Sequence, residues 1–237
     1  MEKEIININI NSIPAIIWGE KANKVFIAVH GNMSNKEDDV IKILAEKVTG
    51  KGYQVLSFDL PEHGERKDDA NYLCKVQNCV KDLRQIIEYA KANYEEINLW
   101  ACSMGAYFSL TAYKDESIKN SFFLSPVVDM KVIIDNLMLW SNTNEETLKE
   151  KQEIKTEFGQ TLYWDYYEYV KNNPITNWNK KTYILYGNED NMQNEDLIRD
   201  FCNKFNCKLS ILENGEHYFH TEEQLKFYKN WLDKVIE

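Results

Sequence analysis

The stretch Ile97-Asn98-Leu99-Trp100-Ala101-Cys102-Ser103-Met104-Gly105 decides how this chain can fold. Its first five residues form a largely apolar run, which is typical of a buried β-strand. The residues that follow Met104 carry a helical pattern, so Ser103 lies where a strand meets a helix. A serine on such a tight turn is held in a strained backbone conformation. The side chains two positions before and after it must be small, and here they are Ala101 and Gly105.

Strands and helices alternate on both sides of this turn. The predicted strands cover residues 6–10, 15–18, 25–29, 53–58, 97–101, 121–125, 182–186 and 208–212. The predicted helices cover residues 40–48, 80–90, 104–110, 194–205 and 225–235. The first two strands suit an antiparallel pair at the edge. This alternation predicts an α/β fold, a mostly parallel sheet flanked by helices, in a single domain that spans residues 1–237.

One segment, residues 129–178, interrupts the alternation. It is rich in aromatic residues, has a helical pattern and contains no clear strand. An insertion between two late strands of such a sheet lies at the carboxyl edge, where ligands bind, so we interpret it as a helical cap over the site. Most of its aromatic residues are expected to pack the cap onto the body. Trp140, Tyr163 and Trp164 are the candidates for substrate-binding side chains.

A serine hydroxyl is a poor nucleophile unless a base removes its proton. The chain has four histidines, at positions 30, 63, 217 and 220. His217 follows the last predicted strand by five residues, and its loop would reach the carboxyl edge where Ser103 lies. His217 is therefore the predicted base, with His220 as the alternative. His30 ends a strand and is expected to shape its own loop through local hydrogen bonds.

The base in turn needs a carboxylate that fixes its tautomer and stabilises the imidazolium. Asp190 is the first candidate, because it follows the predicted strand 182–186 at the same edge of the sheet. Glu189 is the second candidate and Asp129, after the preceding strand, is the third. Carboxylates are abundant in this chain, so the informative feature is the order serine, then aspartate, then histidine.

Acyl transfer also requires backbone N–H groups that bind the developing oxyanion. The N–H of Met104, directly after the serine, is one predicted donor, and the amino end of the helix that starts there favours negative charge. The other predicted donor is the N–H of Asn32. Gly31 before it permits the close backbone approach that such a donor needs.

Five signals in this order resemble the α/β-hydrolase fold superfamily, from about residue 25 to the end of the chain. They are residues 30–32, 59–64, 101–105, 187–190 and 215–217. The resemblance implies an oxyanion loop, a structural loop that holds His63, a nucleophile turn, an acid and a base, in that order. Ala101 departs from the glycine usual in the family, although it is small enough for the turn to survive. The arrangement is also similar to capped bacterial carboxylesterases and to cinnamoyl or feruloyl esterase-like members.

These residues predict a serine hydrolase that cleaves a small or medium carboxylic ester through an acyl-enzyme intermediate. A serine peptidase or amidase is the nearest alternative, and a thioesterase or acyl transferase follows. A non-catalytic ligand-binding member of the fold is the alternative from a different class. No metal and no organic cofactor are implied.

Composition narrows the partners and the location. Hydrophobic residues make up 43% and charged residues 28% of the 237 residues, which is typical of a globular protein. The net charge of −10 repels nucleic acid and anionic lipid, so neither is an expected partner. The five cysteines form no C-x-x-C pair, and the start of the chain is charged, which predicts reduced thiols and a cytoplasmic location. The oligomeric state is left open.

Overall fold

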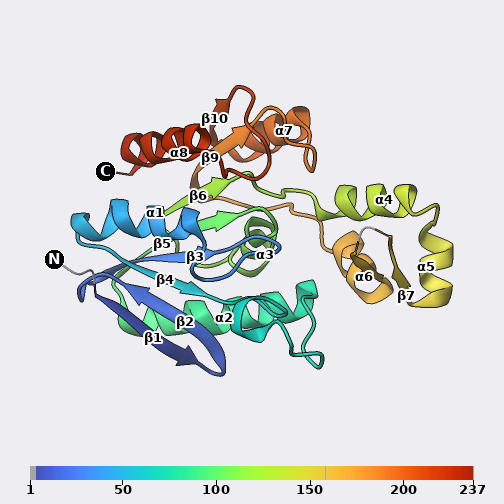
Figure 1. Ribbon diagram of the computed structural model, residues 1–237, viewed down its shortest axis with the longest axis horizontal. Coiled ribbons are helices and arrows are strands. Elements are labelled where there is room, and N and C mark those ends of the chain that lie inside the picture. The colour runs from blue at the N-terminus through green and yellow to red at the C-terminus, as the bar shows by residue number, and fades with distance from the viewer. Residues whose placement is uncertain (1–3, 158, 237) are drawn as a thin grey trace.

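The computed structural model describes residues 4–157 and 159–236. At its centre lies an eight-stranded sheet with the strand order β1-β2-β4-β3-β5-β6-β9-β10 (Figure 1). These strands are β1 (Ile5–Ile10), β2 (Ile13–Trp18), β3 (Lys24–Val29), β4 (Gln54–Phe58), β5 (Glu96–Cys102), β6 (Asn120–Leu124), β9 (Lys181–Gly187) and β10 (Lys208–Leu212). The predicted α/β architecture is confirmed.

The direction of the strands decides where the loops meet. β1 and β2 are antiparallel to their neighbours, whereas all neighbouring strands from β4 to β10 are parallel. Leu99 of the central strand β5 lies between Ile27 of β3 and Ser121 of β6, and all three are buried. Because parallel strands end at the same edge of a sheet, the loops after β3, β5, β6, β9 and β10 gather there.

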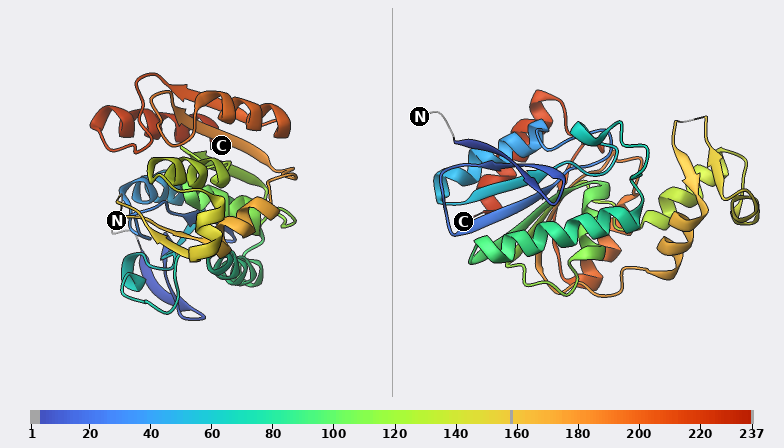
Figure 2. Two further views of the ribbon diagram at one scale, coloured as in Figure 1. Left: turned by 90° about the vertical axis from the view of Figure 1, so that its right-hand side faces the viewer. Right: turned by 90° about the horizontal axis from the view of Figure 1, so that it is seen from below.

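Helices cover both faces of the sheet and bury two apolar cores. The helices that flank the sheet are α1 (Asp39–Val48), α2 (Val76–Asn93), α3 (Met104–Ala112), α7 (Glu195–Phe205) and α8 (Glu222–Val235). α1 and α8 pack on one face around Trp100, while α2, α3 and α7 pack on the other around Phe108. Figure 2 shows α2 lying along its face of the sheet. None of the helices in the described part of the chain is long and apolar enough to cross a membrane.

The insertion between β6 and β9 contains helices and a small sheet of its own. Its elements are α4 (Met130–Trp140), α5 (Glu145–Lys151), β7 (Glu153–Lys155), β8 (Thr161–Tyr163) and α6 (Trp164–Asn172). The prediction that this segment holds no strand is wrong, because β7 and β8 pair antiparallel, with Ile154 opposite Leu162. Strands of three residues are too short to give an alternating pattern that sequence reading can detect.

The insertion lies beyond one end of the central sheet (Figure 1). An ion pair links it to α2, because Lys75 Nζ lies 2.9 Å from both carboxylate oxygens of Asp165 in α6. Gln77 Nε2 in α2 also donates to the Asp165 carbonyl at 3.0 Å. Of the aromatic side chains in residues 129–178, Trp178 is buried and packs on Phe123 of β6, with 6.0 Å between the ring centroids. The insertion is thus attached to the body of the domain by both polar and apolar contacts.

A buried ion pair fixes the loop between β3 and α1. Lys36 Nζ lies 2.8 Å from Asp59 Oδ2, and the two side chains are 4% and 0% exposed. The Asp59 carboxylate also accepts from the backbone N–H groups of Lys36 and Glu65, at 2.9 and 3.0 Å. A carboxylate removed from water needs such partners, since its desolvation costs several kcal/mol. The pair therefore joins the loop after β3 to the end of β4.

We expect Lys36→Met to lower the free energy of unfolding by about 3–5 kcal/mol, because it leaves the Asp59 carboxylate buried without its cation. Lys42→Met is the matched control. Lys42 pairs with Asp39 at 3.5 Å on the surface, with side chains 48% and 79% exposed, and its loss should cost less than about 1 kcal/mol. Urea denaturation of both variants measures the difference, and equal effects would contradict a structural role for the buried pair.

Candidate active site

Ser103 stands in a strained turn between β5 and α3. Its backbone has φ 50° and ψ −124°, a region that residues with a side chain rarely adopt. Backbone hydrogen bonds hold it there, from Ser103 N to the Leu124 carbonyl at 3.1 Å and from Val127 N to the Ser103 carbonyl at 3.0 Å. The turn forms although Ala101 stands at the position where glycine is usual.

Gly105 explains how α3 can pack so tightly behind the serine. A Cβ atom at this position would lie 2.4 Å from the His30 carbonyl oxygen and 2.6 Å from that of Val29. Both distances are too short for any side chain, so α3 can approach the end of β3 because residue 105 is glycine. The close packing brings Ser103 beside the loop that follows β3.

The structure brings Ser103, His217 and Asp190 together. Ser103 Oγ lies 2.8 Å from His217 Nε2, and His217 Nδ1 lies 2.6 Å from Asp190 Oδ2. The Asp190 side chain is 0% exposed, whereas that of His217 is 19% exposed. The acceptor Asp190 on one side leaves Nε2 of a neutral His217 free of its proton and directed at the serine hydroxyl.

Backbone donors hold the Asp190 carboxylate in place. Asp190 Oδ1 accepts from Met192 N at 2.8 Å and from Gln193 N at 3.1 Å, which leaves Oδ2 for the histidine. The loops that carry the acid and the base touch at two glycines, since a Cβ atom on Gly187 would lie 2.3 Å from the Gly215 carbonyl oxygen. The contact fixes the spacing between the two loops.

Gln193 is a buried residue of this site that sequence reasoning missed. Its Oε1 accepts from the backbone N–H groups of Val128 and Asp129, at 3.0 and 2.9 Å. It thereby fastens the loop after β6 to the loop after β9, just behind Asp190. A glutamine in a loop follows no periodic pattern, so nothing in the sequence distinguishes it from an exposed one.

The alternative residues lie elsewhere. Asp129 Oδ1 accepts from Lys131 N at 2.9 Å and caps the amino end of α4. Glu189 is exposed. His220 is also exposed, and its ring stacks on Tyr218 with 5.1 Å between ring centroids. The hydrogen-bonded chain of side chains thus runs through Asp190 and His217.

The loop after β3 passes directly beside the serine. A Cβ atom on Gly31 would lie 3.1 Å from Ser103 Cβ. The Gly31 carbonyl oxygen lies 2.7 Å from His30 Nδ1. Because the peptide is trans, its N–H, which belongs to Asn32, points to the opposite side, away from the His30 ring. Met104 is the first residue of α3, where backbone N–H groups lack a partner within the helix.

Two histidines support this loop from behind. His30 Nε2 accepts from Leu60 N at 3.0 Å, so backbone groups occupy both ring nitrogens of His30. His63 Nε2 accepts from Met33 N at 3.2 Å and lies 3.3 Å from Asn32 Oδ1. Burial lowers the pKa of His30 to about 4, against the raising effect of its bond to the Gly31 carbonyl, so the ring is neutral.

The three aromatic candidates of the insertion have separate surroundings. Trp140, at the end of α4, is 55% exposed. Tyr163, at the end of β8, lies under Lys75 Nζ, which is 4.2 Å from its ring centroid. Trp164 packs beside Tyr167, with 6.0 Å between their ring centroids. None of these contacts joins them to Ser103, so their role in substrate binding stays a prediction.

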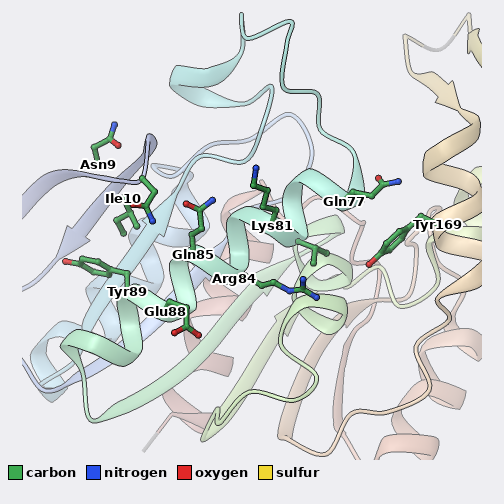
Figure 3. Close-up of a pocket in the computed structure, with 11 residues that line it drawn as sticks. Asn9, Ile10, Gln77, Lys81, Arg84, Gln85, Glu88, Tyr89 and Tyr169 are labelled. Atoms are coloured by element: carbon green, nitrogen blue, oxygen red, sulfur yellow. The ribbon is translucent and has the colours of Figure 1, made fainter.

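A large open groove lies away from the serine. It has a volume of about 1070 Å³ and runs between the β1–β2 turn and the outer face of α2 (Figure 3). Its lining includes Ile10, Gln77, Lys81, Arg84, Tyr89 and Tyr169. Since Ser103, His217 and Asp190 are absent from that lining, the groove is separate from the hydrogen-bonded site.

The mostly parallel sheet, with its serine turn after β5, places the chain in the α/β-hydrolase fold superfamily, as predicted. Sequence comparison is more specific. A model of the family described as serine aminopeptidase, S33, matches residues 20–161, and the chain belongs to this family. No curated protein matches the chain by sequence.

Solved structures share the fold at low identity. Est1E from Butyrivibrio proteoclasticus is 18% identical with a TM-score of 0.76, over 97% of this chain and 98% of that one. Alpha/beta hydrolase domain-containing protein 10 from mouse is 16% identical with a TM-score of 0.74, over 98% of both chains. An esterase from Pyrococcus furiosus is 16% identical with a TM-score of 0.67, over 98% of this chain and 89% of that one.

The neutral state of His30 has a consequence for stability. Its pKa of about 4 in the folded chain lies below the ordinary value of 6.5. As the pH falls below about 6.5, the unfolded chain therefore binds a proton that the folded chain does not. Protonation of His30 in the unfolded chain should therefore lower the free energy of unfolding by up to about 1.4 kcal/mol for each pH unit between about pH 6.5 and about pH 4.

We therefore expect the difference in unfolding free energy between the wild-type chain and His30→Asn to shrink as the pH falls from about 6.5 to about 4. The variant lacks the proton linkage, so acid weakens it less. Urea denaturation at several pH values measures this difference, and a constant difference would contradict a buried neutral His30.

Proposed function

We propose that this hydrolase is a serine esterase, which cleaves a small or medium carboxylic ester through an acyl-enzyme intermediate. One observation carries the proposal: Ser103, His217 and Asp190 form a continuous chain of hydrogen bonds of 2.8 and 2.6 Å at a strained turn. Such a chain supplies the general base that a serine hydroxyl lacks. A ligand-binding protein without catalysis would have no need of it.

In the acylation step, Ser103 Oγ attacks the ester carbonyl carbon while His217 Nε2 takes the hydroxyl proton. Asp190 accepts the bond from His217 Nδ1–H and stabilises the imidazolium that forms. The N–H groups of Met104 and Asn32 donate to the oxyanion of the tetrahedral intermediate. General-base assistance contributes roughly 10²–10⁴-fold, and each oxyanion donor about 10²–10³-fold.

The alcohol then leaves as His217 returns the proton to its oxygen. Water then hydrolyses the acyl-enzyme. His217 removes a proton from the water while its oxygen attacks the acyl carbon. His217 then returns the proton to Ser103 Oγ as the carboxylic acid leaves. Each proton removed by His217 is given back within the same half-reaction, so the cycle needs no other acid or base.

One of the similar solved structures supports an ester over other acyl substrates, because it is named an esterase. A structure of Est1E holds ferulic acid, a carboxylic acid, which agrees with an acyl substrate but does not separate an ester from an amide. The description of the matched family favours a second candidate, cleavage of an amide by a serine aminopeptidase. Thioester hydrolysis uses the same groups and ranks behind both, because no observation favours it.

The insertion is proposed to act as the cap of this site, with Trp140, Tyr163 and Trp164 as candidate contacts for the substrate. It lies between β6 and β9 in the chain, and the Asp129 N–H at its start donates to Gln193 in the loop that holds the acid. The proposed partner is a small-molecule ester, and the acidic surface disfavours nucleic acid and membranes. Five free cysteines support a reducing compartment such as the cytoplasm.

A fluorophosphonate probe is expected to label Ser103 in the wild-type chain and to fail with Ser103→Ala. Hydrolysis of a short p-nitrophenyl ester should be abolished in Ser103→Ala and should fall by roughly 10²–10⁴-fold in His217→Ala. His220→Ala, which changes an exposed histidine three residues away, is the matched control and should keep its activity. Peptide mapping locates the label, and initial rates measure hydrolysis.

Two results would refute this assignment. A folded wild-type protein whose Ser103 resists the probe would not be a serine hydrolase. Activity that survives in His217→Ala and is lost in His220→Ala would show that the base is His220.

Rates on an ester and on an amide of the same acyl group separate the two candidate functions. We expect a p-nitrophenyl ester to be cleaved with a larger kcat/KM than aminoacyl p-nitroanilides, which report aminopeptidase activity. The unreactive variant Ser103→Ala corrects both assays for background. A larger kcat/KM for the anilides would replace the esterase by the aminopeptidase.

A further inference from the structure

Two cysteines outside the catalytic residues lie in contact at the start of α2. Cys74 Sγ lies 3.6 Å from Cys79 Sγ, and both thiols are free. The backbone holds them there, because Cys79 N donates to the Lys75 carbonyl at 3.0 Å in the first turn of the helix. Cys74 is partly exposed, whereas Cys79 is buried. Cys74 is therefore the more accessible member of the pair.

Cys74 also lies near His63, the histidine beside the loop after β3, and each of the two groups shifts the pKa of the other. The hydrogen bond from Cys79 and the nearby His63 outweigh burial and lower the pKa of Cys74 to about 6. Burial raises the pKa of Cys79 well above its ordinary value. Burial would lower the pKa of His63, but the nearby Cys74 raises it. Cys74 thus has the surroundings of a reactive thiol, and Cys79 those of a resolving partner.

We propose that Cys74 and Cys79 form a reversible disulfide when the protein meets a small-molecule disulfide such as oxidised glutathione. The proposal rests on the short distance between the sulfurs, on the exposure of one of them, and on the histidine beside it. A disulfide requires 2.05 Å between its sulfurs, so the two atoms must approach by about 1.5 Å.

The reaction proceeds in two exchanges. The Cys74 thiolate attacks one sulfur of oxidised glutathione, which forms a mixed disulfide and releases one glutathione thiolate. That thiolate takes the proton of Cys79, whose sulfur attacks Cys74 Sγ and releases the second glutathione as a thiolate, which takes up from water the proton that Cys74 had lost on ionising. The cysteine pair loses two electrons and two protons, and oxidised glutathione becomes two molecules of the thiol.

Formation of the disulfide would affect the active site through His63. His63 Nε2 accepts from Met33 N and lies near Asn32 Oδ1, on the loop proposed to bind the oxyanion. When Cys74 moves toward Cys79, its interaction with His63 weakens and the loop loses part of its support. We expect Ser103 to react more slowly, by less than the roughly 10²–10³-fold that loss of an oxyanion donor costs. This consequence rests on the proposed function, whereas the disulfide itself does not.

The second cysteine pair provides a matched control. Cys202 and Cys207 are also five positions apart, and their thiols are in contact near the end of α7. The hydrogen bond from Cys207 lowers the pKa of Cys202, but Cys202 is buried. In the second pair the thiol whose pKa is lowered belongs to a buried residue, whereas in the first pair it belongs to a partly exposed one.

The test treats the full chain with oxidised glutathione at neutral pH, blocks the remaining thiols by alkylation and maps the peptides by mass spectrometry. We expect a Cys74–Cys79 link that dithiothreitol reverses. Cys79→Ser should trap glutathione on Cys74, and Cys74→Ser should leave Cys79 unmodified. Cys207→Ser should form the link like the wild-type chain. Circular dichroism verifies that each variant is folded.

Labelling of Ser103 by the fluorophosphonate probe, before and after oxidation, gives the second readout. Free Cys74 and Cys79 in a folded, treated protein, or a preferred Cys202–Cys207 link, would overturn the proposal. A link that forms without slowing the labelling would refute the connection to the oxyanion loop. A reduced protein that forms the link but is never labelled would refute the proposed function and leave the disulfide standing.

Discussion

The site depends on one strained residue. The backbone of Ser103, with φ 50° and ψ −124°, costs about 1–3 kcal/mol and persists because its surroundings allow no other conformation. β5 is fixed between two parallel neighbours, a hydrogen bond ties Ser103 N to the Leu124 carbonyl, and Gly105 lets α3 press against the end of β3. The sheet and the helix thus supply the free energy that holds the hydroxyl in position, and the remaining groups need only be brought to it.

The parallel sheet brings the acid and the histidine to Ser103, because its strands end at the same edge. The loops after β9 and β10 hold Asp190 and His217, and the close contact of Gly187 with Gly215 locks the two loops together. Gln193 adds a second lock, because it joins the loop after β6 to the loop behind Asp190. Ser103 and His217, which are 114 positions apart in the sequence, therefore meet within hydrogen-bonding distance.

The sequence predicts those parts of the molecule that a pattern of neighbouring residues indicates. Long apolar runs mark the central strands, and the serine, aspartate and histidine each follow one of them, so the order of elements predicts that they meet. The sequence does not predict features that depend on contacts between residues far apart in the chain. β7 and β8 are three residues each and form through pairing with each other. The buried position of Gln193 and the closeness of Cys74 to His63 arise when separate loops pack, and no spacing indicates them.

Three of the four histidines show that surroundings, more than residue type, decide what an imidazole can do. His30 is occupied at both ring nitrogens by backbone groups and stays neutral, so it can support a loop but cannot exchange a proton with a substrate. His217 meets a hydroxyl at one nitrogen and a carboxylate at the other, which is the arrangement that moves a proton. His63 is intermediate, because it holds the loop after β3 through Met33 while a titratable thiol lies near it. Of the two histidines that support that loop, His63 is therefore the one through which the proposed oxidation of Cys74 would change the reactivity of Ser103.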